Sequence, residues 1–87
     1  MALYERTKVD VPKAIRSQYA IQAIDALFDR PIFQTPDFAA RVGTSKSTAE
    51  RILRQLRETG IVHELRQRSG RRAAVLLFGE LVQVVEE

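Results

Sequence analysis

The chain has no cysteine and no long apolar run, and these absences argue against a disulfide-bonded and a membrane-spanning protein. Without cysteine there is no disulfide and no thiolate chemistry, which fits a reducing compartment. The longest apolar run, Ala73 to Phe78, is six residues, far short of the roughly 20 that cross a bilayer as a helix. The first residues also lack the basic-then-apolar pattern of a signal peptide. We therefore expect a cytoplasmic protein with no membrane partner.

The usual residue sets for metal binding and catalysis are missing as well. His63 is the only histidine, whereas a structural metal site needs several nitrogen or sulfur ligands. Ser69 and His63 could be combined into a triad on paper, but no nucleophile elbow surrounds the serine. There is no glycine-rich phosphate loop and no pair of carboxylates in an apolar setting. We expect no metal, no cofactor and no catalytic residue, so this chain by itself is not predicted to be an enzyme.

What the sequence does contain is enough apolar material for one small core. Of its 87 residues, 45% are hydrophobic, which argues against disorder. A chain of this length makes one domain, near the lower size limit for independent folding. We predict a single domain over residues 1–87.

The charge is unevenly placed along the chain. Residues 1–40 carry five basic and five acidic side chains, residues 41–72 carry nine basic and three acidic, and residues 73–87 carry three acidic and no basic ones. The middle segment therefore has a local charge of +6 within a total of +3. Such a concentration is typical of a surface that meets a polyanion, although charge alone fits a solvated helix face equally well.

Apolar spacing and start signals predict a helix over residues 11–29, followed by two shorter ones. Asp10 and Pro12 suit the beginning of the first helix, and Arg30-Pro31 ends it. Residues 32–34 are a short strand or link. Thr35, Pro36 and an acidic third residue then start a helix over residues 36–42, which Gly43 ends.

The next helix is predicted over residues 46–59 with Ser45 as its N-cap, although Ser47 with Glu50 three residues on also fits a capping box. Two apolar segments around a glycine-containing turn then predict a β-hairpin over residues 61–78. Gly79 separates this hairpin from a short C-terminal helix over residues 80–86. The fold class is α+β, mostly α, with a three-helix core, a hairpin and a closing helix. This order is typical of a winged helix-turn-helix.

Three small residues support that topology. Ala39 and Ala49 allow close contact between the second and third helices, and Gly43 supplies the turn between them. With the apolar residues of the third helix inward, its N-terminal half would face the major groove of DNA. The predicted base-facing residues are Lys46, Ser47, Glu50 and Arg51. The residues predicted to contact the DNA backbone are Arg54, Arg57, Arg66, Arg68, Arg71 and Arg72.

Longer segments of the sequence resemble the C-terminal winged-helix domain of Fic-family proteins. They are "LYERTK", "YAIQAIDALFDRPIF", "GTSKSTAERILRQLRETGIV" and "LFGELVQVV", and together they extend from about Leu3 to Val85. The family's AMP-transferase activity resides in a separate upstream domain with a His-Pro-Phe motif and a Gly-Asn-Gly-Arg loop. Neither motif occurs here. The resemblance therefore implies a winged helix with a regulatory role and no catalytic residue.

Two functions remain open from the sequence. The first is a regulatory DNA-binding domain whose partner is double-stranded DNA and which forms a homodimer. The second is a protein-interaction or dimerisation module at the C-terminus of a Fic-family AMP-transferase, with another domain of a longer chain as its partner. The same basic residues would bind phosphate in the first case and solvate the surface in the second.

Overall fold

A computed structural model of the chain describes residues 3–67, 70, 72 and 74–79. Its helices are α1 (Leu3–Ile15), α2 (Ala20–Asp29), α3 (Thr35–Val42) and α4 (Lys46–Glu58), and its strands are β1 (Ile32–Gln34), β2 (Val62–Arg66) and β3 (Val75–Phe78). The C-terminal helix predicted over residues 80–86 lies outside the described residues. None of the described helices is both long and apolar enough to cross a membrane.

The segment predicted as one helix over residues 11–29 is two helices, and this prediction is wrong. The chain reverses between Ile15 and Ala20, where Arg16 adopts the left-handed backbone conformation (φ 44°). The Ser17 hydroxyl accepts a hydrogen bond from the Tyr19 amide at 3.1 Å and steadies this turn. The reversal lets Val11 and Ile15 on α1 and the apolar face of α2 bury in the same core. A straight helix could not place both faces there.

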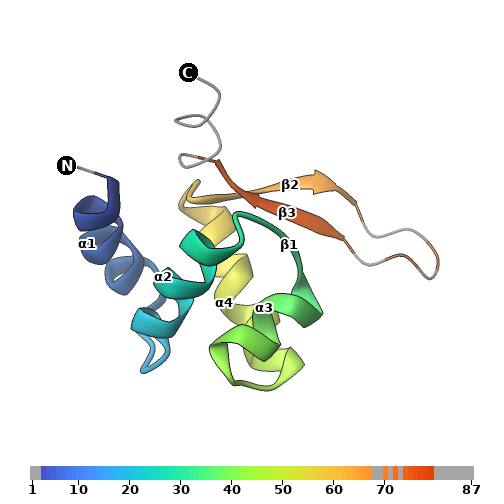
Figure 1. Ribbon diagram of the computed structural model, residues 1–87, viewed down its shortest axis with the longest axis horizontal. Helices are drawn as coiled ribbons and strands as arrows, with labels where there is room; N and C mark the ends of the chain where they lie inside the picture. The colour runs from blue at the N-terminus through green and yellow to red at the C-terminus, as the bar shows by residue number, and fades with distance from the viewer. Residues whose placement is uncertain (1–2, 68–69, 71, 73, 80–87) are drawn as a thin grey trace.

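α1 also begins earlier than the sequence suggested. Pro12 lies inside the helix rather than in its first turn, because burial of Val11 and Ile15 offsets the hydrogen bond that proline cannot make. Near its start, the Thr7 hydroxyl is buried and donates to the Leu3 carbonyl at 2.7 Å. α1 packs against both α2 and α4, so it extends the three-helix core at the end of the molecule opposite the hairpin (Figure 1).

Over the described residues, the sheet has three antiparallel strands in the order β1-β3-β2. Phe33 pairs with Leu76, and Val62 pairs with Phe78. All four of these side chains are buried in the core. Between Glu64 and Arg66 the register shifts, an irregularity that bends and twists a strand. β2 and β3 then run outward side by side, away from the helices (Figure 1).

A tight turn joins α3 to α4. Gly43 ends α3 with φ 82°, and both its amide and that of Thr44 donate to the Ala39 carbonyl, at 2.9 and 3.1 Å. Only glycine adopts this left-handed conformation without a steric cost. On either side of the turn Phe38, Val42, Ala49 and Ile52 are buried. Helix, turn and helix followed by a hairpin make the fold an α+β winged helix-turn-helix, as predicted; we call the β2–β3 hairpin the wing.

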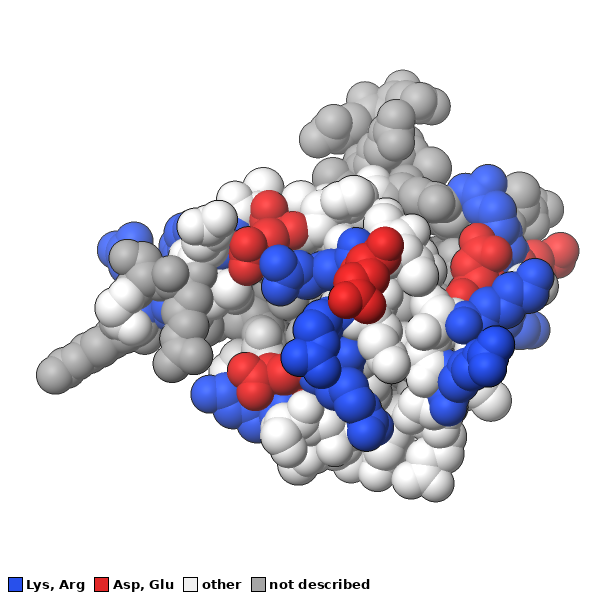
Figure 2. Space-filling view, turned by 180° about the vertical axis from the view of Figure 1, so that it is seen from behind, with Lys and Arg blue, Asp and Glu red and all other residues white. Residues whose placement is uncertain are grey.

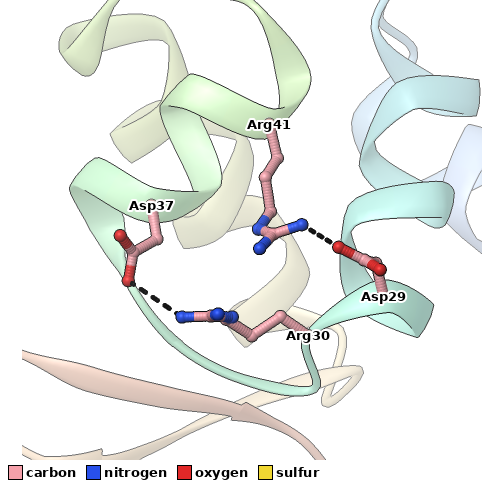
Figure 3. A network of polar contacts seen from close by, with 4 residues as sticks. All are labelled: Asp29, Arg30, Asp37 and Arg41. Carbon is pink, nitrogen blue, oxygen red and sulfur yellow. Dashed lines mark ion pairs between the residues drawn. The ribbon is translucent and has the colours of Figure 1, made fainter.

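Two ion pairs connect the end of α2 to α3 (Figure 3). Arg41 pairs with Asp29, and Arg30 Nη1 lies 4.0 Å from Asp37 Oδ2. These side chains are between about a third and two thirds exposed, so each pair stabilises the fold by roughly 1 kcal/mol or less. Their main consequence is electrostatic, because Arg41 is matched by an acid and adds little to the basic field.

Candidate nucleic-acid interface

α4 separates its apolar and charged residues onto opposite faces. Ala49, Ile52, Leu53 and Leu56 are buried, and at about 100° per residue they occupy one continuous side of the helix. The other side is exposed and carries the four basic residues predicted from the sequence, together with a serine and a glutamate. These exposed residues are Lys46, Ser47, Glu50, Arg51, Arg54 and Arg57.

Ser45 fixes the N-terminus of α4. Its hydroxyl accepts a hydrogen bond from the Thr48 amide at 3.2 Å, which resolves the choice between Ser45 and Ser47 as the cap in favour of Ser45. The cap satisfies one of the four amides that a helix start leaves unpaired. It therefore sets where the exposed face of α4 begins.

Replacing Ser45 by alanine should lower the free energy of unfolding by about 1 kcal/mol, because the Thr48 amide loses its acceptor. Urea unfolding followed by circular dichroism measures this change. Ser47→Ala is the matched control, since Ser47 is exposed and lies one residue inside the helix. An equal loss in both variants would contradict the assignment of Ser45 as the cap.

A groove of about 510 Å³ separates α4 from the wing and the start of α3. We call it the wing groove. Its floor is apolar, with Leu53 from α4 and Leu76 from β3. The charged residues that line it are Lys46, Glu50, Arg54, Arg57 and Glu64. The structure thus brings four of the predicted site residues of α4 to one concave surface beside the hairpin.

The charges in the wing groove are not equivalent. Arg57 Nη2 lies 3.6 Å from Glu64 Oε1, so this arginine is partly neutralised by the wing. Among the described residues, neither Lys46 nor Arg54 forms an ion pair. Both are exposed, so their donors face solvent. Lys46 and Arg54 are therefore the strongest cationic positions of this groove.

Arg51 lies on the opposite flank of α4. It lines a second hollow with Gln55 and with the turn between α1 and α2, including Arg16. The structure therefore does not bring all four predicted base-facing residues together. The sequence does not predict Arg16 as a site residue, because its apolar spacing predicts a continuous helix over residues 11–29 that includes this position.

The wing contributes the remaining predicted residues only in part. Arg66, at the end of β2, and Arg72 are exposed. Arg68 and Arg71 lie outside the described residues. Figure 2 shows basic side chains gathered over α4 in the middle of the face opposite that of Figure 1, and a second group towards α1. Acidic side chains lie among them, which agrees with Glu50 and Glu64 in the wing groove.

One solved structure connects this fold to a class of proteins. The chain is similar to residues 1–100 of a possible transcriptional regulatory protein from Mycobacterium bovis, with 27% sequence identity and a TM-score of 0.59. The match covers 98% of this chain and 96% of that one. Comparison of the sequence with protein-family models finds no match, and comparison with curated proteins finds none either. The chain therefore has the fold of a regulator-like domain, and the resemblance to Fic-family proteins stays a prediction.

Proposed function

We propose that this domain binds double-stranded DNA in a regulatory role, with α4 in the major groove and the wing along the backbone. The observation that carries the proposal is the wing groove, where Lys46 and Arg54 face solvent beside the hairpin. The similarity to a possible transcriptional regulatory protein supports the same class of function. The resemblance to Fic-family winged helices is compatible with it.

The dimensions of α4 suit this role. Its 13 residues span about 20 Å at 1.5 Å per residue, and the major groove of B-DNA, about 12 Å wide, admits one helix. In the proposed complex Lys46, Ser47 and Glu50 approach base edges, because they lie in the N-terminal half of α4. The residues proposed to meet phosphates are Arg54, Arg57, Arg66, Arg68, Arg71 and Arg72.

Binding should depend strongly on salt. If about five basic side chains neutralise phosphates, the logarithm of the association constant should fall against the logarithm of salt concentration with a slope of about −4 to −5. Fluorescence anisotropy with a labelled mixed-sequence duplex, at about 50 and 200 mM salt, measures this slope. Absence of binding at the lower salt concentration would refute the proposal.

A second function is favoured by large apolar side chains that remain in solvent. Val9 on α1 is 53% exposed and Ile21 on α2 is 71% exposed. On this alternative, α1 and α2 bind a second copy of the domain or another domain of a longer chain. Sedimentation velocity would show an assembly that Ile21→Ser weakens and Arg54→Ala leaves unchanged. A dimer could also serve DNA binding, since one small domain contacts few base pairs.

A further inference from the structure

The hollow beside Arg51 is unlike the wing groove in its chemistry. It has a volume of about 570 Å³ and is lined by Ile15, Arg16, Ser17, Gln18, Tyr19, Arg51 and Gln55. We call it the turn hollow, because residues 16–19 form the turn between α1 and α2. Among the described residues, no acidic side chain lines it, whereas Glu50 and Glu64 line the wing groove.

Two arginines therefore line one hollow to which no described carboxylate contributes. Among the described residues, neither Arg16 nor Arg51 takes part in an ion pair. Both side chains are exposed. The Ser17 hydroxyl accepts from the Tyr19 amide, which leaves its hydrogen to donate outward. An arginine fork binds phosphate oxygens bidentately, and a serine hydroxyl can also donate to them.

The turn hollow lies on the flank of α4 opposite the wing groove. The wing groove takes Lys46, Glu50 and Arg54 from one flank of α4, and the turn hollow takes Arg51 and Gln55 from the other. A helix in the major groove has a sugar-phosphate backbone on each side. If the wing follows one strand, the turn hollow faces the other.

We infer that the turn hollow holds a phosphate of the DNA strand opposite the wing, between Arg16 and Arg51. This inference rests on the proposed function and extends its contact surface from α4 to the turn between α1 and α2. It also assigns Arg51 to the DNA backbone rather than to a base edge. Arg51 then positions α4 in the major groove of the DNA. The residues nearer the start of α4 contact the bases and read the DNA sequence.

The test is the affinity of Arg16→Ala for a mixed-sequence duplex. Alanine has the same Cβ as arginine, so the left-handed backbone of residue 16 bears the same steric cost in both proteins. Loss of one phosphate contact should lower affinity about eightfold at 0.1 M salt and reduce the salt slope by about 1. Arg16→Lys, which keeps the charge, should recover part of the affinity.

Lys13→Ala is the matched control. It removes the same charge, but Lys13 lies beside Thr59 and Gly60, where α4 ends, and its loss should change affinity less than twofold. Wild-type binding together with equal affinities of the Arg16 and Lys13 variants would overturn the inference and leave the proposed function intact. Failure of the wild-type domain to bind DNA would overturn both.

A double-mutant cycle tests whether the two arginines hold the same phosphate. Arg16→Ala and Arg51→Ala should not be additive, because either change already loosens the shared phosphate. Full additivity would contradict a shared site. A titration with inorganic phosphate, followed by NMR, is the last control. If phosphate shifts the signals of Arg16 and Arg51 while Arg16→Ala leaves DNA affinity unchanged, the turn hollow binds free anions and the inference is wrong.

Discussion

Replacing Phe38 by alanine is expected to lower the free energy of unfolding by about 3–5 kcal/mol. Phe38 is only 1% exposed, and its ring stacks on that of Phe33 with 5.4 Å between centroids. It thereby connects α3 to β1, which in turn pairs with β3 at the base of the wing. Removing the ring loses this burial and leaves a cavity, and both effects destabilise.

Such a loss is a large part of the stability of a small domain, which is typically about 5–15 kcal/mol. Urea unfolding followed by circular dichroism measures it. Ile21→Ala is the control, since Ile21 is 71% exposed and should change stability by less than about 0.5 kcal/mol. A loss below about 1.5 kcal/mol for Phe38→Ala would mean that the ring does not hold α3 against the sheet, because it falls well under the range for a buried phenylalanine.

The second large effect is expected for DNA affinity when Lys46 and Arg54 are both changed to alanine. Loss of the Arg54 phosphate contact should lower the association constant roughly eightfold at 0.1 M salt. Loss of the Lys46 base contact should cost about 1–3 kcal/mol, or roughly 5- to 150-fold, so the double variant should bind at least about 40-fold more weakly. The salt slope should fall in magnitude by about 1, from loss of the Arg54 phosphate contact. Lys46 and Arg54 are chosen because both line the wing groove and neither has an ion-pair partner among the described residues.

Two controls separate local contact from general charge. Lys8→Ala with Lys13→Ala removes the same total charge from α1, where Lys13 lies beside Thr59 and Gly60 at the end of α4. Arg41→Ala removes a basic residue that Asp29 already neutralises. Both proteins should bind within about threefold of wild type, because salt screens exposed charges that do not contact the DNA and because Asp29 already neutralises Arg41. A comparable loss in the α1 double variant would contradict α4 as the contact surface.

Local signals in the sequence predicted much of the helix-turn-helix. Gly43 ends α3 in the left-handed conformation and Ser45 caps α4, and both roles follow from residue types whose short-range chemistry favours them. The hairpin was also predicted, as two apolar segments around a glycine-containing turn. The sequence does not decide whether the third strand, β1, is a strand or a link, because three residues carry too little periodicity.

The break between α1 and α2 was not predictable in the same way. Apolar residues at helical spacing continue from Val11 through Leu27, and a straight helix and a reversed pair share that pattern. The reversal depends on tertiary packing, because both helices bury against the same core. The position of Arg16 beside Arg51 and the pairing of Arg41 with Asp29 depend on this reversal and on the α2–α3 contact. A count of basic residues along the sequence therefore misses Arg16 as part of the proposed interface. It also overestimates the contribution of Arg41 to the basic field, because Asp29 neutralises Arg41.

The most direct test of the proposed interface is an NMR titration of the ¹⁵N-labelled domain with an unlabelled duplex at low salt. Amide signals are expected to shift over the α3–α4 turn, the N-terminal half of α4, the wing and the turn between α1 and α2. Signals from the exposed face of α1 around Val9 should remain in place. Shifts confined to α1, or none at all at low salt, would contradict DNA binding through α4 and favour a protein-interaction module.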